Sequence, residues 1–293
     1  MKTELFESFF NKPSKFDNWE QVFENPQPII IETLKTGKII TKISGILNLD
    51  NPNASEIKDG YAEIPVLAHL IRHEVFGDYL VDTGFDSAFG RQPGGNFKGL
   101  YKRFYFKNRY SQDKESDGIE NQIIERKVNL KGVFLTHIHE HASGAPSLPD
   151  DIPYYFGDGE RDEKIYPFVY SNFFKGKKFI NKIDFTSAQQ MPILGGCIDV
   201  FGDGSFWAIS TPGHTKGHIS YIVNGLEEKV LITGDECITR KGFELGIETG
   251  KHSYNIKQGR ECFLRISSFS QTYPFVKLKF GHETDEYSVK YLK

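Results

Sequence analysis

The chain has 293 residues, of which 38% are hydrophobic and 26% charged, and its formal net charge is −3. These proportions are typical of a globular protein and exclude a chain dominated by disorder. The small net charge gives no general electrostatic reason to bind nucleic acid or an anionic membrane, so we expect a small-molecule substrate as the partner.

The amino-terminal sequence and the cysteines bear on the compartment. The sequence MKTELFESFFNKPSKFDNW mixes acidic, basic and aromatic residues and lacks the apolar stretch of a signal peptide or a membrane span. The three cysteines, Cys197, Cys237 and Cys262, are scattered and include no Cys-x-x-Cys pair. We therefore expect a cytoplasmic protein without a disulfide framework.

The first part of the chain is predicted to form strands. The segments PIIIETL and KIITKISGIL, between residues 28 and 47, flank a Thr-Gly pair, which predicts a β-hairpin. A second hairpin is expected where EIPVLAHLIRHEV and YLVDTG meet at residues 76–78, and it places Asp82 at a strand end. Residues 84–118 are rich in glycine and aromatic rings and have no regular period, so we interpret them as an insertion over the sheet edge.

Helices and strands alternate in the rest of the chain. Asp117 is expected to cap a helix through NQIIERKV, after which KGVFLT predicts a buried strand. Further strands are predicted at IPYYF, CIDVF, FWAIST, HISYIV, KVLITG and KLKF, and a helix is predicted over 255–270. This order favours one α/β domain over residues 1–293, a sandwich with its site along one sheet edge.

A cluster of histidines follows the predicted strand KGVFLT. Three of the nine histidines, His137, His139 and His141, fall within five residues there. Alternate residues at a strand end project to the same side, so His137 and His139 can bind one ion at about 2.0–2.1 Å. A lone histidine is more often a loop or core residue, but this clustering favours a metal site.

Three other strand ends carry residues that bind metals. His214 lies in a tight turn after FWAIST, Asp235 closes KVLITG, and His282 follows KLKFG. A carboxylate can bridge two cations while neutral imidazoles fill the remaining positions. This mixed set of nitrogen and oxygen ligands suits one or two zinc ions, with iron or manganese as alternatives.

The order of five motifs resembles the metallo-β-lactamase superfamily: VDTG at 81–84, LTHIHEHASG at 135–144, TPGHTKGH at 211–218, ITGD at 232–235 and FGH at 280–282. The resemblance covers nearly the whole chain after about residue 60. It implies a four-layer αβ/βα sandwich with two metal ions at the sheet edge. The phrase GHTKGHISY and the insertion resemble most the lactonase-like branch, which opens cyclic esters.

The histidine cluster departs from the family pattern His-x-His-x-Asp-His, because Glu140 and His141 directly follow His139. With a one-residue gap, Glu140 replaces the aspartate and His141 keeps the histidine position. Without a gap, His141 takes the aspartate position and Ala142 the histidine position. We prefer the gap, because the residues after His141 then match the family's continuation. The departure leaves a site with one metal ion as an alternative to a site with two.

The resemblance implies a role for each residue of the site. Two ligand sets follow from it: His137, His139 and His214 for the first ion, and Glu140 or His141 with Asp235 and His282 for the second. Asp235 would bridge the ions, and Asp235 and Glu140 are the expected catalytic residues. Asp82 would orient the ligands from behind, and His218 is expected to support the site from outside the ligand set.

The activity implied is hydrolysis of a small ester or lactone, acyl-homoserine lactones included, by a metal-bound hydroxide. Tyr101, Phe104 and Tyr105 would form a lid or pocket wall over the substrate. The alternatives are phosphodiester or thioester hydrolysis on the same metals, oxidation of a thiol or persulfide at a single iron, and binding without catalysis. Lactonases of this branch often carry a tyrosine three residues after the bridging aspartate, where this chain has Ile238.

Overall fold

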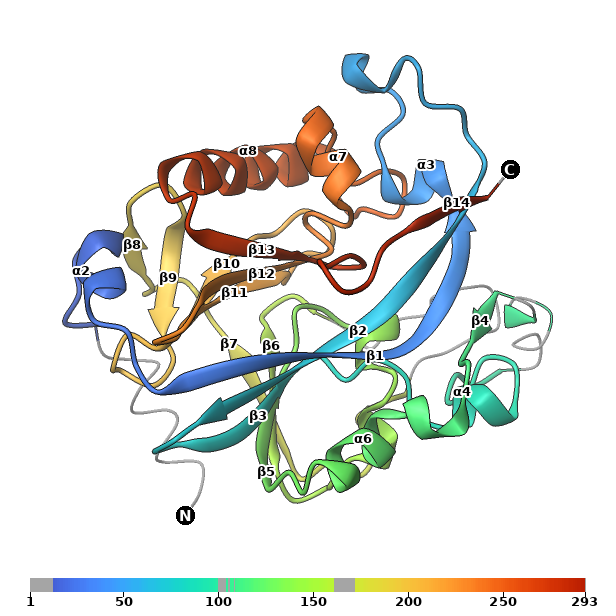
Figure 1. The fold of residues 1–293 in the computed structure, drawn as a ribbon, viewed down its shortest axis with the longest axis horizontal. Helices are drawn as coiled ribbons and strands as arrows, with labels where there is room; N and C mark the ends of the chain where they lie inside the picture. The colour runs from blue at the N-terminus through green and yellow to red at the C-terminus, as the bar shows by residue number, and fades with distance from the viewer. Residues whose placement is uncertain (1–12, 100–103, 105, 108, 161–171, 293) are drawn as a thin grey trace.

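Two β-sheets lie face to face in the structure, a computed structural model that describes residues 13–99, 104, 106–107, 109–160 and 172–292 (Figure 1). The first sheet has eight strands in the order β4-β1-β2-β3-β5-β6-β7, and β14 pairs with β2. Its strands are β1 Ile29–Lys42, β2 Tyr61–His73, β3 Gly77–Val81, β4 Tyr110–Ser111, β5 Leu130–Phe134, β6 Pro153–Gly157, β7 Phe179–Ile183 and β14 Lys290–Leu292.

The second sheet has six strands in the order β13-β12-β11-β10-β9-β8. Its strands are β8 Gln189–Met191, β9 Gly195–Asp199, β10 Phe206–Ser210, β11 Ile219–Asn224, β12 Lys229–Gly234 and β13 Val276–Phe280. The pairs β3–β5, β5–β6 and β6–β7 of the first sheet and β12–β13 of the second are parallel, and the other pairs are antiparallel.

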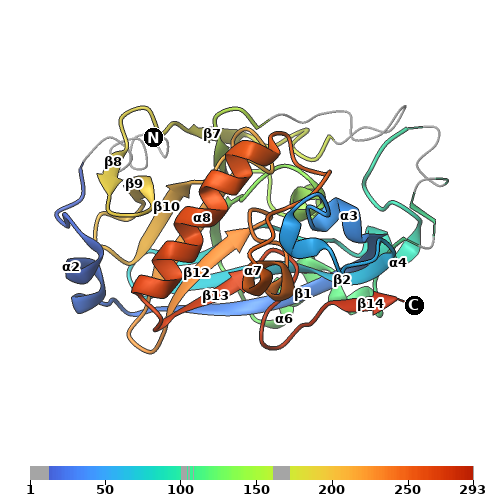
Figure 2. The ribbon, with the colours of Figure 1, turned by 90° about the horizontal axis from the view of Figure 1, so that it is seen from above.

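Helices cover the outer faces of both sheets. Figures 1 and 2 show α8 and α7 over the six-stranded sheet, whereas α6 lies under the eight-stranded sheet. The described α-helices are α2 Trp19–Glu24, α3 Ile43–Ile46, α4 Ala88–Arg91, α6 Ile119–Glu125, α7 Arg240–Leu245 and α8 Ile256–Thr272. None of these helices is both long enough and apolar enough to cross a membrane. The predicted four-layer αβ/βα sandwich is confirmed.

Three hydrophobic cores fill the spaces between the four layers. In β10, Phe206 and Ala208 point into the core between the sheets, whereas Trp207 and Ile209 point into the core beneath α8. Successive side chains of a strand point to opposite faces, so a strand buried on both faces is apolar throughout. This explains why FWAIST, KVLITG and KGVFLT read as unbroken apolar runs in the sequence.

The first predicted hairpin is wrong, because residues 29–42 form the single long strand β1. The Thr-Gly pair produces only a register shift in the pairing of β1 with β2. Thr36 is fully buried: its hydroxyl donates to the Val66 carbonyl and accepts from the Phe85 amide. A Cβ at Gly37 would overlap the Phe85 ring, so the glycine is required here by close packing.

Most other elements agree with the sequence, but Ile43–Ile46, expected to be part of a strand, form the short helix α3, and one predicted helix start is wrong. The second hairpin is confirmed as β2 and β3, and the later strands and the long helix α8 lie where the sequence predicts them. Asp117 does not cap α6, whose N-cap is Gly118. The Asp117 carboxylate instead accepts from the Lys114 amide in the preceding 3₁₀ turn, Glu115–Asp117.

Replacing Thr36 by valine tests the continuous strand. Valine keeps the shape of the side chain but leaves the Phe85 amide and the Val66 carbonyl without this partner, so we expect a loss of about 1–3 kcal/mol in the free energy of unfolding. Urea unfolding measures it. Thr41→Val, on the same strand and half-buried, is the control; an equal loss in both variants would contradict the role of the Thr36 hydroxyl.

Candidate metal centre

Strand ends from both sheets meet at one edge of the sandwich. The histidine cluster follows β5 of the first sheet, and the other ligand candidates follow β10, β12 and β13 of the second sheet. Six predicted ligands therefore come together: His137, His139, His141, His214, Asp235 and His282. All except His139 are buried, with at most 3% of their surface exposed.

The first group consists of His137, His139 and His214, whose ligand atoms lie within 4.8 Å of one another. His139 Nδ1 is 3.1 Å from His214 Nε2. Asp235 Oδ2 faces this group, 3.4 Å from His214 Nε2 and 3.8 Å from His137 Nε2.

The second group forms around the other oxygen of Asp235. His141 Nε2 and His282 Nε2 are 3.1 Å apart, and Asp235 Oδ1 lies 3.3 Å and 3.5 Å from them. Glu140 Oε1 is 3.9 Å from His282 Nε2 and lies toward solvent. The two oxygens of Asp235 thus face different histidine groups, which is the arrangement that a bridging carboxylate requires.

The position of His141 distinguishes the two alignments of the cluster. The His141 imidazole lies among the ligand candidates, whereas the Ala142 side chain is fully buried in the hydrophobic core beside α6. The structure therefore supports the alignment with a one-residue gap. In that alignment Glu140 stands where the family has aspartate, and the 3₁₀ turn Glu140–Ala142 carries it.

Hydrogen bonds fix which nitrogen of His137 is free. Asp82 accepts from the Thr136 amide at 2.8 Å and from the Thr136 hydroxyl at 2.9 Å. Since that hydroxyl has one hydrogen, it must accept from His137 Nδ1, which lies 2.9 Å away. His137 Nε2 is then unprotonated and directed at the cluster. Asp82 therefore contacts His137 through Thr136, a residue that the sequence did not single out, and its Oδ2 also lies 3.4 Å from His141 Nδ1.

A backbone carbonyl fixes His282 in the same way. His282 Nδ1 lies 2.6 Å from the carbonyl oxygen of Pro65 on β2. A carbonyl can only accept, so Nδ1 carries the proton and Nε2 presents its lone pair to His141 and Asp235. No local sequence signal indicated Pro65, because 217 positions separate it from the histidine.

The ligand atoms fit a bound cation. His137 Nε2 and Asp235 Oδ1 are buried and have no hydrogen-bond partner within the described chain. Two ligand atoms placed tetrahedrally at about 2.0–2.1 Å from one ion would be about 3.3 Å apart. Five of the separations, at 3.1–3.5 Å, are close to that value, whereas His137 Nε2–Asp235 Oδ2 at 3.8 Å and Glu140 Oε1–His282 Nε2 at 3.9 Å are longer.

Burial and charge set the protonation of the cluster. Burial lowers the pKa of His137 and of His214 well below the usual range, which keeps both imidazoles in the neutral form that binds metals. Burial acts the same way on His141, but Asp235 and Asp82 outweigh it and raise its pKa. Burial raises the pKa of Asp235, but His282 and His141 hold it well below the usual range.

His218 lies behind the first group and is not among the ligand candidates. Its Nδ1 is 2.9 Å from the Thr211 hydroxyl, which in turn contacts the Ser220 hydroxyl at 3.0 Å. Its ring centroid is 5.5 Å from that of His137. Burial lowers the pKa of His218 to about 3, so it is a neutral packing partner of the ligands.

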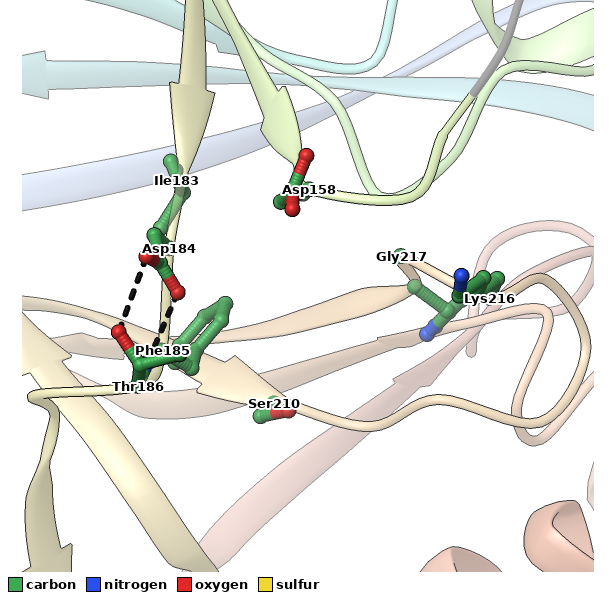
Figure 3. Close-up of a pocket in the computed structure, with 10 residues that line it drawn as sticks. Asp158, Ile183, Asp184, Phe185, Thr186, Ser210, Lys216 and Gly217 are labelled. Atoms are coloured by element: carbon green, nitrogen blue, oxygen red, sulfur yellow. Dashed lines mark hydrogen bonds between the residues drawn. The ribbon is translucent and has the colours of Figure 1, made fainter.

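The expected pocket aromatics are described only in part. Tyr101 and Tyr105 lie outside the described residues, and Phe104 is 81% exposed. A cavity of 310 Å³ opens elsewhere, between Asp184 to Thr186 after β7 and Lys216 to Gly217 before β11 (Figure 3). It is lined by His218 but by none of the six ligand candidates, so it is adjacent to the metal centre and separate from it.

Known proteins share the sequence and the fold. No protein-family model matches the chain. N-acyl homoserine lactonase AttM of Agrobacterium fabrum is 27% identical over 219 residues, which cover 72% of this chain and 77% of the relative. An atrochrysone carboxyl ACP thioesterase of Aspergillus terreus is 26% identical over 124 residues, 42% of this chain and 31% of the relative.

The structural comparison agrees with the sequence relatives. A solved N-acyl homoserine lactone hydrolase, with the product N-hexanoyl-L-homoserine bound at its catalytic metal centre, has a TM-score of 0.68. It is 19% identical and covers 89% of this chain and 95% of that chain. The chain therefore has the fold of solved N-acyl homoserine lactone hydrolases and of a hydrolase in the beta lactamase superfamily. Its sequence is similar to N-acyl homoserine lactonases of the AttM type.

Asp82→Asn tests the orientation of His137. Asp82 has a left-handed backbone, with φ 60°, that asparagine also tolerates, so the change removes the carboxylate with little backbone strain. An amide offers one acceptor instead of two, so we expect metal affinity to fall about 10–100-fold. Competition with a zinc indicator measures this. Asp203→Asn, at a carboxylate paired with His73, is the control, and unchanged zinc affinity in Asp82→Asn would exclude the role.

Proposed function

We propose that this protein is a metal-dependent hydrolase that opens a lactone or another small ester, with N-acyl homoserine lactones as the first substrates to test. The observation that carries the proposal is the Asp235 carboxylate, each oxygen of which faces a different group of histidines. The lactonase relatives supply the substrate class.

A divalent ion held by these ligands would lower the pKa of a bound water to about 7 and so supply hydroxide at neutral pH. Burial keeps His137 and His214 neutral, because it lowers the pKa of each, and Thr136 and Pro65 fix the free nitrogens of His137 and His282. His139 and Glu140 are the half-buried members of the site, so a substrate approaches from their side. We propose zinc as the metal, because neutral imidazoles with one carboxylate suit it.

We propose two ions, with Glu140 as the second ion's additional carboxylate. Glu140, Asp235 and His282 have ligand atoms within 4.8 Å of one another. The extra methylene of glutamate, compared with aspartate, compensates for the residue missing from the loop. A site with one metal ion, which the sequence left as an alternative, would use only the first group.

Ile238 favours thioester hydrolysis as a second candidate. Its side chain is buried, and its carbonyl accepts from the His282 amide, so no hydroxyl reaches the site from this position. A lactone expels an alkoxide that needs a proton, whereas a thioester expels a thiolate whose conjugate thiol has a pKa of only about 8.5. The thioesterase relative, of which this chain covers 31%, points the same way.

The proposal also covers the kind of substrate, the location, the domain organisation and the lid. We propose a small-molecule substrate and a cytoplasmic location, in keeping with the near-neutral charge and with three cysteines that are free and buried. We also propose one domain over the whole chain, since the core between the sheets draws residues from both halves. Tyr101, Phe104 and Tyr105 remain the proposed lid.

A substrate panel tests the activity. Zinc-loaded protein is expected to hydrolyse N-acyl homoserine lactones, simple lactones or acyl thioesters, and to lose this activity in His137→Gln because a first-group ligand is removed. His73→Gln, which changes a buried histidine remote from the site, is expected to retain it. Ring opening is followed by chromatography and thiol release by a colorimetric reagent. Fully metallated protein that hydrolyses none of these would refute the proposal, and iron with oxygen consumption would favour the oxidation alternative.

Glu140→Gln tests the second ion. Wild-type protein is expected to contain two divalent ions per chain, and the variant closer to one, because an amide is a weaker ligand than a carboxylate. Metal content after dialysis is measured by mass spectrometry. Glu115→Gln, at an exposed surface carboxylate, is the control. One ion per chain in the wild type would support the mononuclear site instead.

A further inference from the structure

The buried carboxylate of Glu160 has no part in the metal groups described above. Glu160 lies in the turn after β6, and only 6% of its surface is exposed. Its amide donates to the Gly157 carbonyl at 3.1 Å, which closes the turn and directs the side chain inward. Charged residues are rarely buried unless they are paired or fully hydrogen-bonded, so the contacts of this carboxylate require an explanation.

The two oxygens of Glu160 bind two different loops. Oε2 accepts from the Ile138 amide at 2.8 Å. Oε1 accepts from the Gly217 amide at 3.2 Å and from the Thr215 hydroxyl through a short hydrogen bond. Burial raises the pKa of Glu160, and these three donors oppose the shift. Because each contact is a donor, the carboxylate form is the one that this environment recognises.

Two of these three donors, Ile138 and Thr215, stand next to ligand candidates of the first group. Ile138 lies between His137 and His139 in the loop after β5 of the eight-stranded sheet. Thr215 directly follows His214 in the loop between β10 and β11 of the six-stranded sheet. One carboxylate therefore joins, across the two sheets, the two loops that supply all three imidazoles of the first group.

The backbones at this junction are in close contact. A Cβ at Gly217 would come within 2.7 Å of both the Glu160 amide nitrogen and the Gly157 oxygen. A Cβ at Gly157 would overlap the Gly217 carbonyl. Gly217, the second glycine in TPGHTKGH, thus lets the His214 loop approach the Glu160 turn. The separation of these loops is fixed by van der Waals contact as well as by hydrogen bonds.

None of the hydrogen bonds of Glu160 reaches the second group. His141 is supported by Asp82 at 3.4 Å, and His282 is supported by the Pro65 carbonyl. Asp235 and His282 follow β12 and β13, to which Glu160 makes no hydrogen bond. Asp82 thus contacts both groups, through Thr136 and at His141, whereas Glu160 contacts only the first, so we expect the effect of losing Glu160 to fall on the first group.

We propose that Glu160 is a positioning residue that sets the spacing of His137, His139 and His214 and so determines the affinity of the first metal position selectively. The inference rests on the proposed function for the identity of the site as a metal centre. Glu160 is not itself a ligand, yet it would raise the metal affinity of the first position without changing that of the second.

Glu160→Gln tests the selectivity through metal binding. A glutamine offers one acceptor oxygen and turns an N–H group toward one of the amide donors, so the loops must separate. We expect the affinity of one of the two zinc ions to fall about 10–100-fold, the range typical of residues that orient metal ligands, with the other unchanged. Competition titration with a zinc indicator and metal content after dialysis measure both affinities.

A second variant identifies which ion is lost. In His282→Gln the second group is incomplete, and the protein is expected to keep one ion in the first position. Adding Glu160→Gln to this variant is expected to remove that ion as well, and excess zinc should restore it. The cobalt-substituted protein should show the same loss as weaker visible absorption from the first position. Equal zinc affinity in Glu160→Gln and wild type would overturn the inference.

The control is Glu248→Gln, another buried glutamate that accepts hydrogen bonds from Asn48, Asn51 and Arg260. It is expected to keep both ions. Loss of both ions together in Glu160→Gln, with a lowered melting temperature, would also overturn the inference, because it would indicate general destabilisation. If wild-type protein binds two ions and Glu160→Gln loses only one of them, but no substrate is hydrolysed, the proposed function would be refuted. The inference about Glu160 would still hold.

Discussion

The Asp235 carboxylate is the interaction on which the rest of the site depends. It is 97% shielded from solvent, and its two oxygens point at separate histidine groups. Burying a carboxylate costs free energy unless positive charge or hydrogen-bond donors surround it. Asp235 therefore requires either a bound cation or protonated imidazoles at the sheet edge. Close packing holds it there, since a Cβ at Gly281 would overlap Asp235 Oδ1.

The two histidine groups share Asp82, which contacts Thr136 and His141, but their other supports differ. The first is supported by Asp82 through Thr136 and by Glu160 through backbone amides and a hydroxyl, whereas His282 of the second group depends on the Pro65 carbonyl. The second group also has a half-buried member, Glu140, on a shortened loop. If two ions bind here, their affinities would therefore differ even though both would lie against the Asp235 carboxylate.

The choice between a lactone and a thioester depends on the leaving group. Both reactions need the same nucleophile and the same polarised carbonyl, so the metal ligands cannot distinguish them. Ile238 places an apolar side chain where lactonases of this branch often have a tyrosine, and it is packed in the core beside α6. A proton for an alkoxide would then have to come from another element, whereas a thiolate needs none at neutral pH.

The sequence alone determined the candidate ligand residues and most strands, because strand patterns and the residues that follow a strand are local features. The sequence could not show that β1 passes through Thr36 and Gly37 without turning, since that depends on partners in β2 and at Phe85. Only the tertiary structure showed that His141 rather than Ala142 enters the cluster and that Asp235 faces both groups. It also revealed Pro65 and Glu160, whose partners lie far away along the chain. Contacts of this kind depend on how the two sheets pack, and no local pattern records them.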